Sequence, residues 1–181
     1  HPERVWIDNL GPKINSQYPE YSPMINADES VIIFTSRRET GIGDEIDVED
    51  MGFMEDIFTS YRDIDGNWVQ TMGLDENINT KSHDATSGFS TDGLTIFIYY
   101  GHKGMGDIYI SQKIDGIWSK AKSLGKKING KNTHETSACL SFDGKKLYFS
   151  SNREGGYGGH DLWVSNWDPN RMEWGEPKNM G

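Results

Sequence analysis

Cysteine is almost absent from this sequence, because Cys139 is the only one among 181 residues. A single thiol excludes an internal disulfide framework and a zinc site built from several cysteines. Apolar runs are also short, and none approaches the roughly 20 residues of a membrane-spanning helix, so we do not expect a membrane-embedded protein. His1 to Arg4 lack the apolar core of a signal peptide, and we expect that any such signal was removed or never included.

Basic residues and prolines are scarce as well. The chain has 18 Lys and Arg against 28 Asp and Glu, a formal net charge of -10, which would repel a nucleic-acid backbone. The basic stretches, 120–131 and Arg37-Arg38, are too thin to reverse this, so no nucleic-acid partner is expected. Only 6 prolines stand against 21 glycines, with 12% aromatic and 34% hydrophobic residues, a composition that favours a turn-rich β protein over a helical bundle.

A repeat runs through the whole chain. Related Leu-x-x-x-Ile-Asn linkers begin at Leu10, Leu74 and Leu124, and Asn179-Met180-Gly181 starts the pattern again. Each repeat then carries an acid, a turn aspartate eight residues later, an aromatic-rich run, an Asp-aliphatic-aromatic segment, and a turn with a tryptophan. Aromatic and β-branched runs separated by Asp-Gly turns are typical of short antiparallel strands, four per repeat.

Units of four strands and roughly 50 residues predict an all-β fold of β-propeller blades. We expect three antiparallel blades at about 10–73, 74–123 and 124–181, with 1–9 as the outer strand of a preceding blade. Three blades do not close a ring, so the chain is expected to be a partial propeller, a fragment of a larger one, or half of a two-chain assembly. Inner strands are predicted at 21–26, 86–90 and 136–141, and outer strands at Trp68, Trp118 and Trp174.

The repeat resembles the WD40-like β-propeller repeat of TolB-type proteins, through Ser90-Thr91-Asp92-Gly93 with Asp107-Ile108-Tyr109 and Ser141-Phe142-Asp143-Gly144 with Asp161-Leu162-Trp163. The first repeat departs from the pattern at Ala27-Asp28-Glu29. The linkers and the closing Pro-Lys-Asn-Met-Gly narrow the resemblance to the propeller segment of Bacteroidetes OmpA-family envelope proteins, including the peptidoglycan-associated component of type IX secretion. It implies a periplasmic location and peptidoglycan binding only through a domain absent from these residues.

Polar positions that recur in every repeat are expected to hold blades together rather than to bind a ligand. This structural, inter-blade set comprises Asn15, Asn79, Asn129, Glu20, Asp84, Glu135, Asp28, Asp92 and Asp143. Cys139 is expected to be buried on an inner strand.

The linkers and the loops between the second and third strands should share one face, here called the rim face, which also receives His83 and His134. Its loops, 37–55, 101–106 and 152–160, vary most among the repeats, which is typical of a binding face. The predicted partner-binding residues are Arg37, Arg38, His102, Asn152, Arg153 and His160. An open alternative is that Arg153 only pairs with Asp161 or Glu135 in its own blade. If Arg38 and Arg153 instead bind a partner, reversing both charges should leave the thermal midpoint nearly unchanged.

Catalytic patterns are incomplete, and no catalytic residue, metal or cofactor is assigned. His134-Glu135-Thr136-Ser137-Ala138 lacks the second histidine of a zinc-protease motif, and the sequence has no Gly-x-Ser-x-Gly. Seven acids within 44–56 could attract calcium, but their spacing matches no calcium loop.

The favoured function is therefore a non-enzymatic interaction module that binds a protein partner in a bacterial cell envelope. The alternatives are an accessory propeller of a hydrolase or lyase, and a glycan-binding propeller using Tyr99, Tyr100 and Tyr157.

Overall fold

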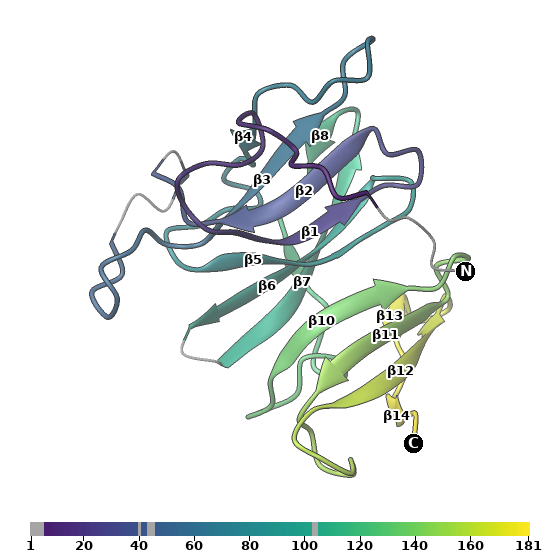
Figure 1. Cartoon of the computed structure of the whole chain (residues 1–181). Coiled ribbons are helices and arrows are strands. Elements are labelled where there is room, and N and C mark those ends of the chain that lie inside the picture. Colours follow the sequence, from purple (N-terminus) through teal and green to yellow (C-terminus); the bar gives the residue numbers. More distant parts are fainter. Residues whose placement is uncertain (1–5, 40, 43–45, 103–104) are drawn as a thin grey trace, which may run out of the picture.

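The computed structural model describes residues 6–39, 41–42, 46–102 and 105–181, without the side chains of 102 and 105. All regular elements in this part of the chain are strands, in three antiparallel sheets that follow one another along the sequence (Figure 1). No helix there could cross a membrane. The predicted all-β architecture of propeller blades is confirmed.

Each sheet has the strand order of one blade. The first contains β1 (Glu20–Ile25), β2 (Val31–Ser36), β3 (Asp56–Tyr61) and β4 (Met72–Gly73). The second contains β5 (Asp84–Phe89), β6 (Thr95–His102), β7 (Met105–Ile114) and β8 (Ile117–Trp118), and β9 (Lys122–Ser123) also pairs with β7. The third contains β10 (Glu135–Leu140), β11 (Lys146–Ser151), β12 (Asp161–Asp168) and β13 (Glu173–Trp174), and β14 (Lys178–Asn179) also pairs with β12.

The strand positions follow the sequence pattern closely. The inner strands β1, β5 and β10 begin one or two residues before their predicted starts. Trp118 and Trp174 lie in the outer strands β8 and β13, whereas Trp68 forms only an isolated bridge with Arg62. Residues 6–9 form no strand, and 1–5 lie outside the described residues, so their assignment to a preceding blade stays a prediction.

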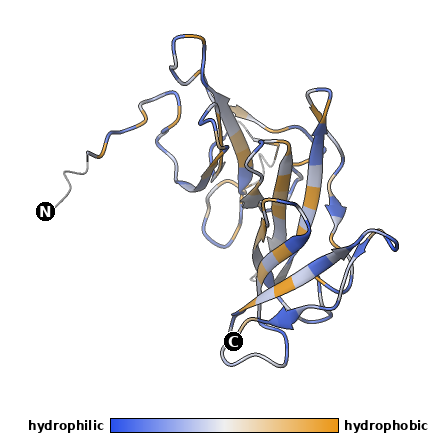
Figure 2. Cartoon of the chain, turned by 90° about the vertical axis from the view of Figure 1, so that its right-hand side faces the viewer, coloured by the Kyte–Doolittle hydropathy of each residue, from blue (hydrophilic) through white to orange (hydrophobic). Residues whose placement is uncertain are grey.

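The hydrophobic core lies between the sheets, because alternate residues of each middle strand face opposite neighbours. Ile33 and Ile57 of the first blade pack with Ile96 and Ile98 of the second. On the other side of the second blade, apolar residues pack against the third, among them Phe97, Ile108, Leu147, Phe149 and Trp163. Apolar colour therefore concentrates along the strands in Figure 2 and polar colour in the loops.

The expectation that Cys139 is buried is wrong, because the thiol is exposed. Cys139 alternates on β10 with the buried Ala138, which packs toward the second blade. Leu162 of the same blade is also 61% exposed. Both residues lie on the side of the third blade that no other described sheet covers.

Candidate functional site

The strand registers bring one end of every sheet to the rim face. Glu20, Asp84 and Glu135 pair with Ser36, Tyr100 and Ser151, which in turn pair with Asp56, Asp107 and Asp161. Three positions are thus equivalent in every blade: the acid that starts the inner strand, its partner on the second strand, and the aspartate of the third strand that pairs with that partner. A residue that differs at one of these positions in a single blade therefore marks a local feature of that blade.

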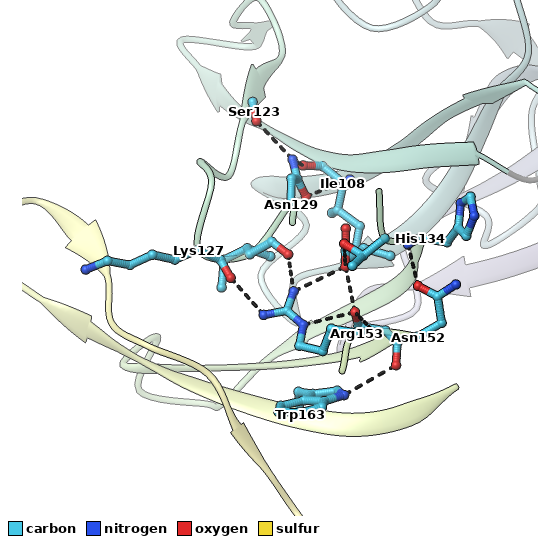
Figure 3. A network of polar contacts seen from close by, with 12 residues as sticks. Ile108, Ser123, Lys127, Asn129, His134, Asn152, Arg153 and Trp163 are labelled. Carbon is cyan, nitrogen blue, oxygen red and sulfur yellow. Dashed lines mark hydrogen bonds and ion pairs between the residues drawn. The ribbon is translucent and has the colours of Figure 1, made fainter. Parts of the chain in front are cut away.

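Arg153 clamps the third blade from inside (Figure 3). Its guanidinium donates to the carbonyl oxygens of Lys127 (2.9 Å) and Ile128, and Nε donates to Ser151 Oγ at 3.0 Å. It lies 3.2 Å from Glu135 Oε1, and its Cζ is 4.8 Å from the centre of the Phe149 ring. The side chain is only 14% exposed and that of Glu135 is fully buried.

Arg38 makes the same clamp in the first blade. It donates to the carbonyl oxygen of Ile14 at 2.8 Å, pairs with Glu20 at 2.7 Å, and lies over the Phe34 and Phe58 rings. Burial raises the pKa of Glu20, but hydrogen bonds from Ser16 and Arg38 outweigh it and hold this pKa below its usual value.

These contacts change the interpretation of the two arginines. The sequence predicts that both offer their guanidinium groups to a partner, yet both hold a linker against an inner strand of their own blade. The alternative pairing of Arg153 with Glu135 is the one that the structure shows. The expectation that charge reversal would spare the fold is therefore withdrawn, because either change would bury an additional carboxylate beside an existing one.

The second blade lacks this clamp. Tyr100 stands on the second strand where the other blades have Ser36 and Ser151, and His102 stands where they have arginine. The Tyr100 hydroxyl donates to the carbonyl oxygen of Ile78 at 2.5 Å and so takes over the linker contact. Its ring lies 4.7 Å from that of Tyr109. The acid of this blade, Asp84, bonds to Thr80 and forms no ion pair within the described residues.

Asp84 has the electrostatic signature expected of an acid without its arginine. The residue is 1% exposed. Burial raises its pKa to about 7 against opposing hydrogen bonds from Thr80, and the nearby charges of Asp56 and Glu55 add to the rise.

We expect Asp84 to make the protein less stable as the pH rises from about 4 to 7, because over this range the folded state keeps a proton that the unfolded state releases. Asp84→Asn should raise the free energy of unfolding at pH 8 by about 4 kcal/mol, since the pKa is raised from 3.8 to about 7 and one pKa unit corresponds to about 1.4 kcal/mol. Urea denaturation between pH 4 and 8 measures both effects. Asp115→Asn, in an exposed turn, is the control, and an unchanged pH dependence in Asp84→Asn would contradict the prediction.

The hydrogen bonds of the repeated asparagines differ between blades, because Asn79 and Asn129 have a described blade before them and Asn15 does not. Asn79 accepts from the Ile57 amide at 2.9 Å and donates to the Ile57 carbonyl at 3.0 Å, which ties the second linker to β3. Asn129 makes the same pair of bonds with Ile108 of β7 (Figure 3). Asn15 instead donates to Asn9 at 2.9 Å.

The turn aspartates are expected from the sequence to hold blades together, but their hydrogen bonds stay within their own turns. Asp28, Asp92 and Asp143 accept hydrogen bonds from residues of their own turns, such as the Leu94 amide to Asp92 at 2.9 Å. An aspartate at this position closes an Asx turn locally, which leaves its carboxylate no reach to the next sheet. Contact between the first two turns is made by the backbone, from the Ala27 amide to the Thr91 oxygen at 2.8 Å.

The acidic insertion of the first repeat folds back onto the rim face. Arg37 donates to both oxygens of Asp50, with the longer contact at 2.8 Å, and His83 lies 3.2 Å from Asp47 and 3.3 Å from Glu55. The Arg37 bond holds the pKa of Asp50 well below its usual range. Arg37 is therefore paired within the chain, and Asp44 and Glu45 lie outside the described residues.

The remaining predicted binding residues are spread along this face. Asn152 accepts from the His134 amide at 2.8 Å and so joins the loop after β11 to the start of β10 (Figure 3). His160 is exposed. His102 ends β6, and its side chain lies outside the described residues.

A cleft opens on the rim face where the second and third blades meet. It has a volume of about 420 Å³ and is lined by Tyr100, Gly106, Asp107, Tyr109, Gly130, Asn132, Thr133 and His134. In the third blade, Asp161 accepts from the amides of Tyr157 and Gly158, and so supports its long loop. In the second blade β6 and β7 stay paired beyond this position as far as His102 and Met105, and Asp107 accepts no hydrogen bond from the described residues.

Two further polar atoms near Asp107 lack partners within the described part of the chain. They are His134 Nδ1 and Glu135 Oε2, and both are buried. Burial and the charge of Glu135 raise the pKa of Asp107, while His134 lowers it. Sequence reasoning placed His134 and Glu135 on this face but missed Asp107 as a site residue. The signal was the replacement of Ser and Arg by Tyr100 and His102 in the second repeat alone.

No family model matches the chain, and no curated protein does. Among solved structures it is similar to a TolB protein from Agrobacterium tumefaciens, with a TM-score of 0.51 and 16% identity over 87% of this chain and 44% of that one. The chain has the fold of a TolB-type β-propeller. A puromycin-hydrolysing peptidase from Mycobacterium tuberculosis gives a TM-score of 0.50 and 13% identity over 87% of this chain and 21% of that one. The propeller domain of the Trilobed protease from Pyrococcus furiosus gives 0.48 and 11% identity over 90% and 43%. The chain thus spans less than half the length of each of these three chains.

Proposed function

We propose that this propeller segment is a non-enzymatic interaction module of a bacterial cell-envelope protein, and that its rim face binds a protein partner. The observation that carries this proposal is the cleft between the second and third blades. It adjoins the second blade, which has no arginine clamp, and Asp107 and His134 line it. Asp107, His134 Nδ1 and the nearby buried Glu135 Oε2 have no hydrogen-bond partner among the described residues. Buried polar atoms without partners cost stability, so an arrangement that retains them favours binding over structural support.

The likeness to TolB supports a periplasmic location. The resemblance of the linkers to OmpA-family and type IX secretion proteins supports the same compartment. In such a protein, peptidoglycan would be bound by a domain outside these 181 residues. The net charge of -10 disfavours a nucleic-acid partner.

The competing proposal is an accessory propeller beside a catalytic domain. It is motivated by the structural similarity to the peptidase from M. tuberculosis. The two proposals differ in their partner, since an accessory propeller would contact its own catalytic domain and an interaction module would contact another protein.

Site-specific photo-crosslinking distinguishes the faces. A photoreactive residue at Lys131 or Tyr157, both exposed on the rim face, should give a discrete adduct with an envelope protein of the source cell. The same residue at Asp65 or Asp115, in exposed turns at the other end of the sheets, should give none. Equal adducts from both ends, or no adduct from the rim face, would contradict the proposal.

A further inference from the structure

The clamps of the first and third blades show what this fold places between an acid and a pair of aromatic rings. In both, a guanidinium lies over two rings, with Cζ at 5.3 and 4.8 Å in the first and 4.8 and 5.4 Å in the third. A carboxylate lies beside it, at 2.7 Å from Arg38 and 3.2 Å from Arg153. The cleft of the second blade has a ring pair, Tyr100 and Tyr109, and a carboxylate, Asp107, but none of the described residues supplies an arginine there.

The polar groups of the cleft lining that lack partners among the described residues can accept hydrogen bonds. Asp107 brings a carboxylate to the lining, and Nδ1 of His134, another lining residue, accepts when the ring proton is on Nε2. The Glu135 side chain is fully buried, and its charge acts on Asp107. A ligand that satisfies this set must therefore bring donors.

The charges around the cleft are also unbalanced. Arg153 is shared between Glu135 Oε1, Ser151 and two linker carbonyls, so it neutralises one of the two carboxylates. Asp107 remains without a cation in the described chain. A ligand with one positive charge would restore the balance and lie against the tyrosine rings, where cation–π attraction adds to the ion pair.

We propose that this cleft receives the guanidinium of an arginine side chain from the partner, with Asp107 as its carboxylate and Tyr100 and Tyr109 as its aromatic wall. A guanidinium supplies a planar set of N–H donors that suits a carboxylate and stacks on aromatic rings. The partner's arginine would thus make the kinds of contact that Arg38 and Arg153 make, with a carboxylate and two aromatic rings. Its site would differ from theirs, because Asp107 is equivalent in the strand register to Asp56 and Asp161, and Asp84 is the equivalent of the clamp acids. This inference rests on the proposed function, because it names the chemistry by which the rim face binds.

The test uses capped tripeptides, acetyl-Gly-Arg-Gly-amide and its lysine and citrulline counterparts, titrated into the whole chain and followed through backbone amide NMR shifts. The arginine peptide should bind saturably and shift amides in 105–109 and 130–135. The citrulline peptide, which has the same shape without the charge, should not bind. Equal binding of arginine and citrulline, or no saturable shift with arginine, would overturn the proposal.

Asp107→Asn should weaken the arginine peptide at least about tenfold, equivalent to ~1.4 kcal/mol. Asp115→Asn changes the net charge equally, in the turn after β7, and should leave affinity unchanged. Because Asp107 accepts no hydrogen bond from the described residues, its replacement should not lower the thermal midpoint. Equal affinities of the two variants would contradict the role of Asp107. A calcium titration is a further arm, and displacement of the peptide by calcium would show a metal site instead.

The two proposals can fail separately. Crosslinks that persist in Asp107→Asn while the arginine peptide does not bind would overturn only the guanidinium inference. Peptide binding without any crosslinked partner would overturn the proposed function.

Discussion

Replacing Arg153 with glutamate is expected to lower the free energy of unfolding by about 3–5 kcal/mol, the usual cost of breaking a buried ion pair. The substitution removes the donors to Lys127, Ile128 and Ser151, and it places a second carboxylate beside the fully buried Glu135. Equilibrium denaturation in urea measures the loss. The free energy of unfolding of Arg153→Lys should lie between those of the parent and of Arg153→Glu, because an ammonium group cannot reach both linker carbonyls and the acid with the same planar geometry.

Arg171→Glu is the matched control. It makes the same charge reversal on the same blade, on a side chain that is 71% exposed and 3.8 Å from Asp168. Exposed ion pairs contribute little, so this variant should stay within about 0.5–1 kcal/mol of the parent. If Arg153→Glu were as stable as Arg171→Glu, the clamp would contribute nothing and Arg153 would again be available to a partner.

Replacing Gly88 with alanine is expected to separate the inner strands of the second and third blades. A Cβ at Gly88 would lie well inside van der Waals distance of the Ala138 carbonyl oxygen, a backbone atom of β10 that cannot rotate away, and 3.0 Å from the Phe97 ring. Overpacking of this kind costs about 1–3 kcal/mol, and more where only backbone can yield. The loss should appear in urea denaturation.

Gly159→Ala is the control for Gly88, because nothing lies near the Cβ that it would add and the residue is exposed. It should leave stability within about 0.5 kcal/mol of the parent. Equal stability of the two alanine variants would mean that β5 and β10 are not packed as closely as described.

The blade architecture could be predicted from the sequence because each signal is local or recurs at a fixed position. The Asp-Gly turns, the aromatic runs and Trp118 and Trp174 identify strands without knowledge of the neighbouring blade. Asn79 and Asn129 each end a Leu-x-x-x-Ile-Asn linker, and the bonds that they make to Ile57 and Ile108 are the same in both blades.

The site could not be predicted to the same extent, because it depends on contacts between segments far apart in the chain. Arg153 appeared to be a loop arginine, and nothing local shows that the Ile128 carbonyl and Glu135 lie within its reach. The exposure of Cys139 depends on which side of the third blade is covered. Asp107 belongs to a repeated motif, and its sequence context does not distinguish it from Asp161. Only the structure shows that Asp161 accepts from the Tyr157 and Gly158 amides, whereas Asp107 accepts from none of the described residues.

The most direct test of the account combines the partner with the cleft. A photoreactive residue at Tyr157 is crosslinked in envelope extract with acetyl-Gly-Arg-Gly-amide or its citrulline counterpart present as competitor. If the rim face binds its partner through an arginine in the cleft, the arginine peptide will abolish the adduct in a concentration-dependent way and the citrulline peptide will not. An adduct equally strong with both peptides at saturation would contradict the account.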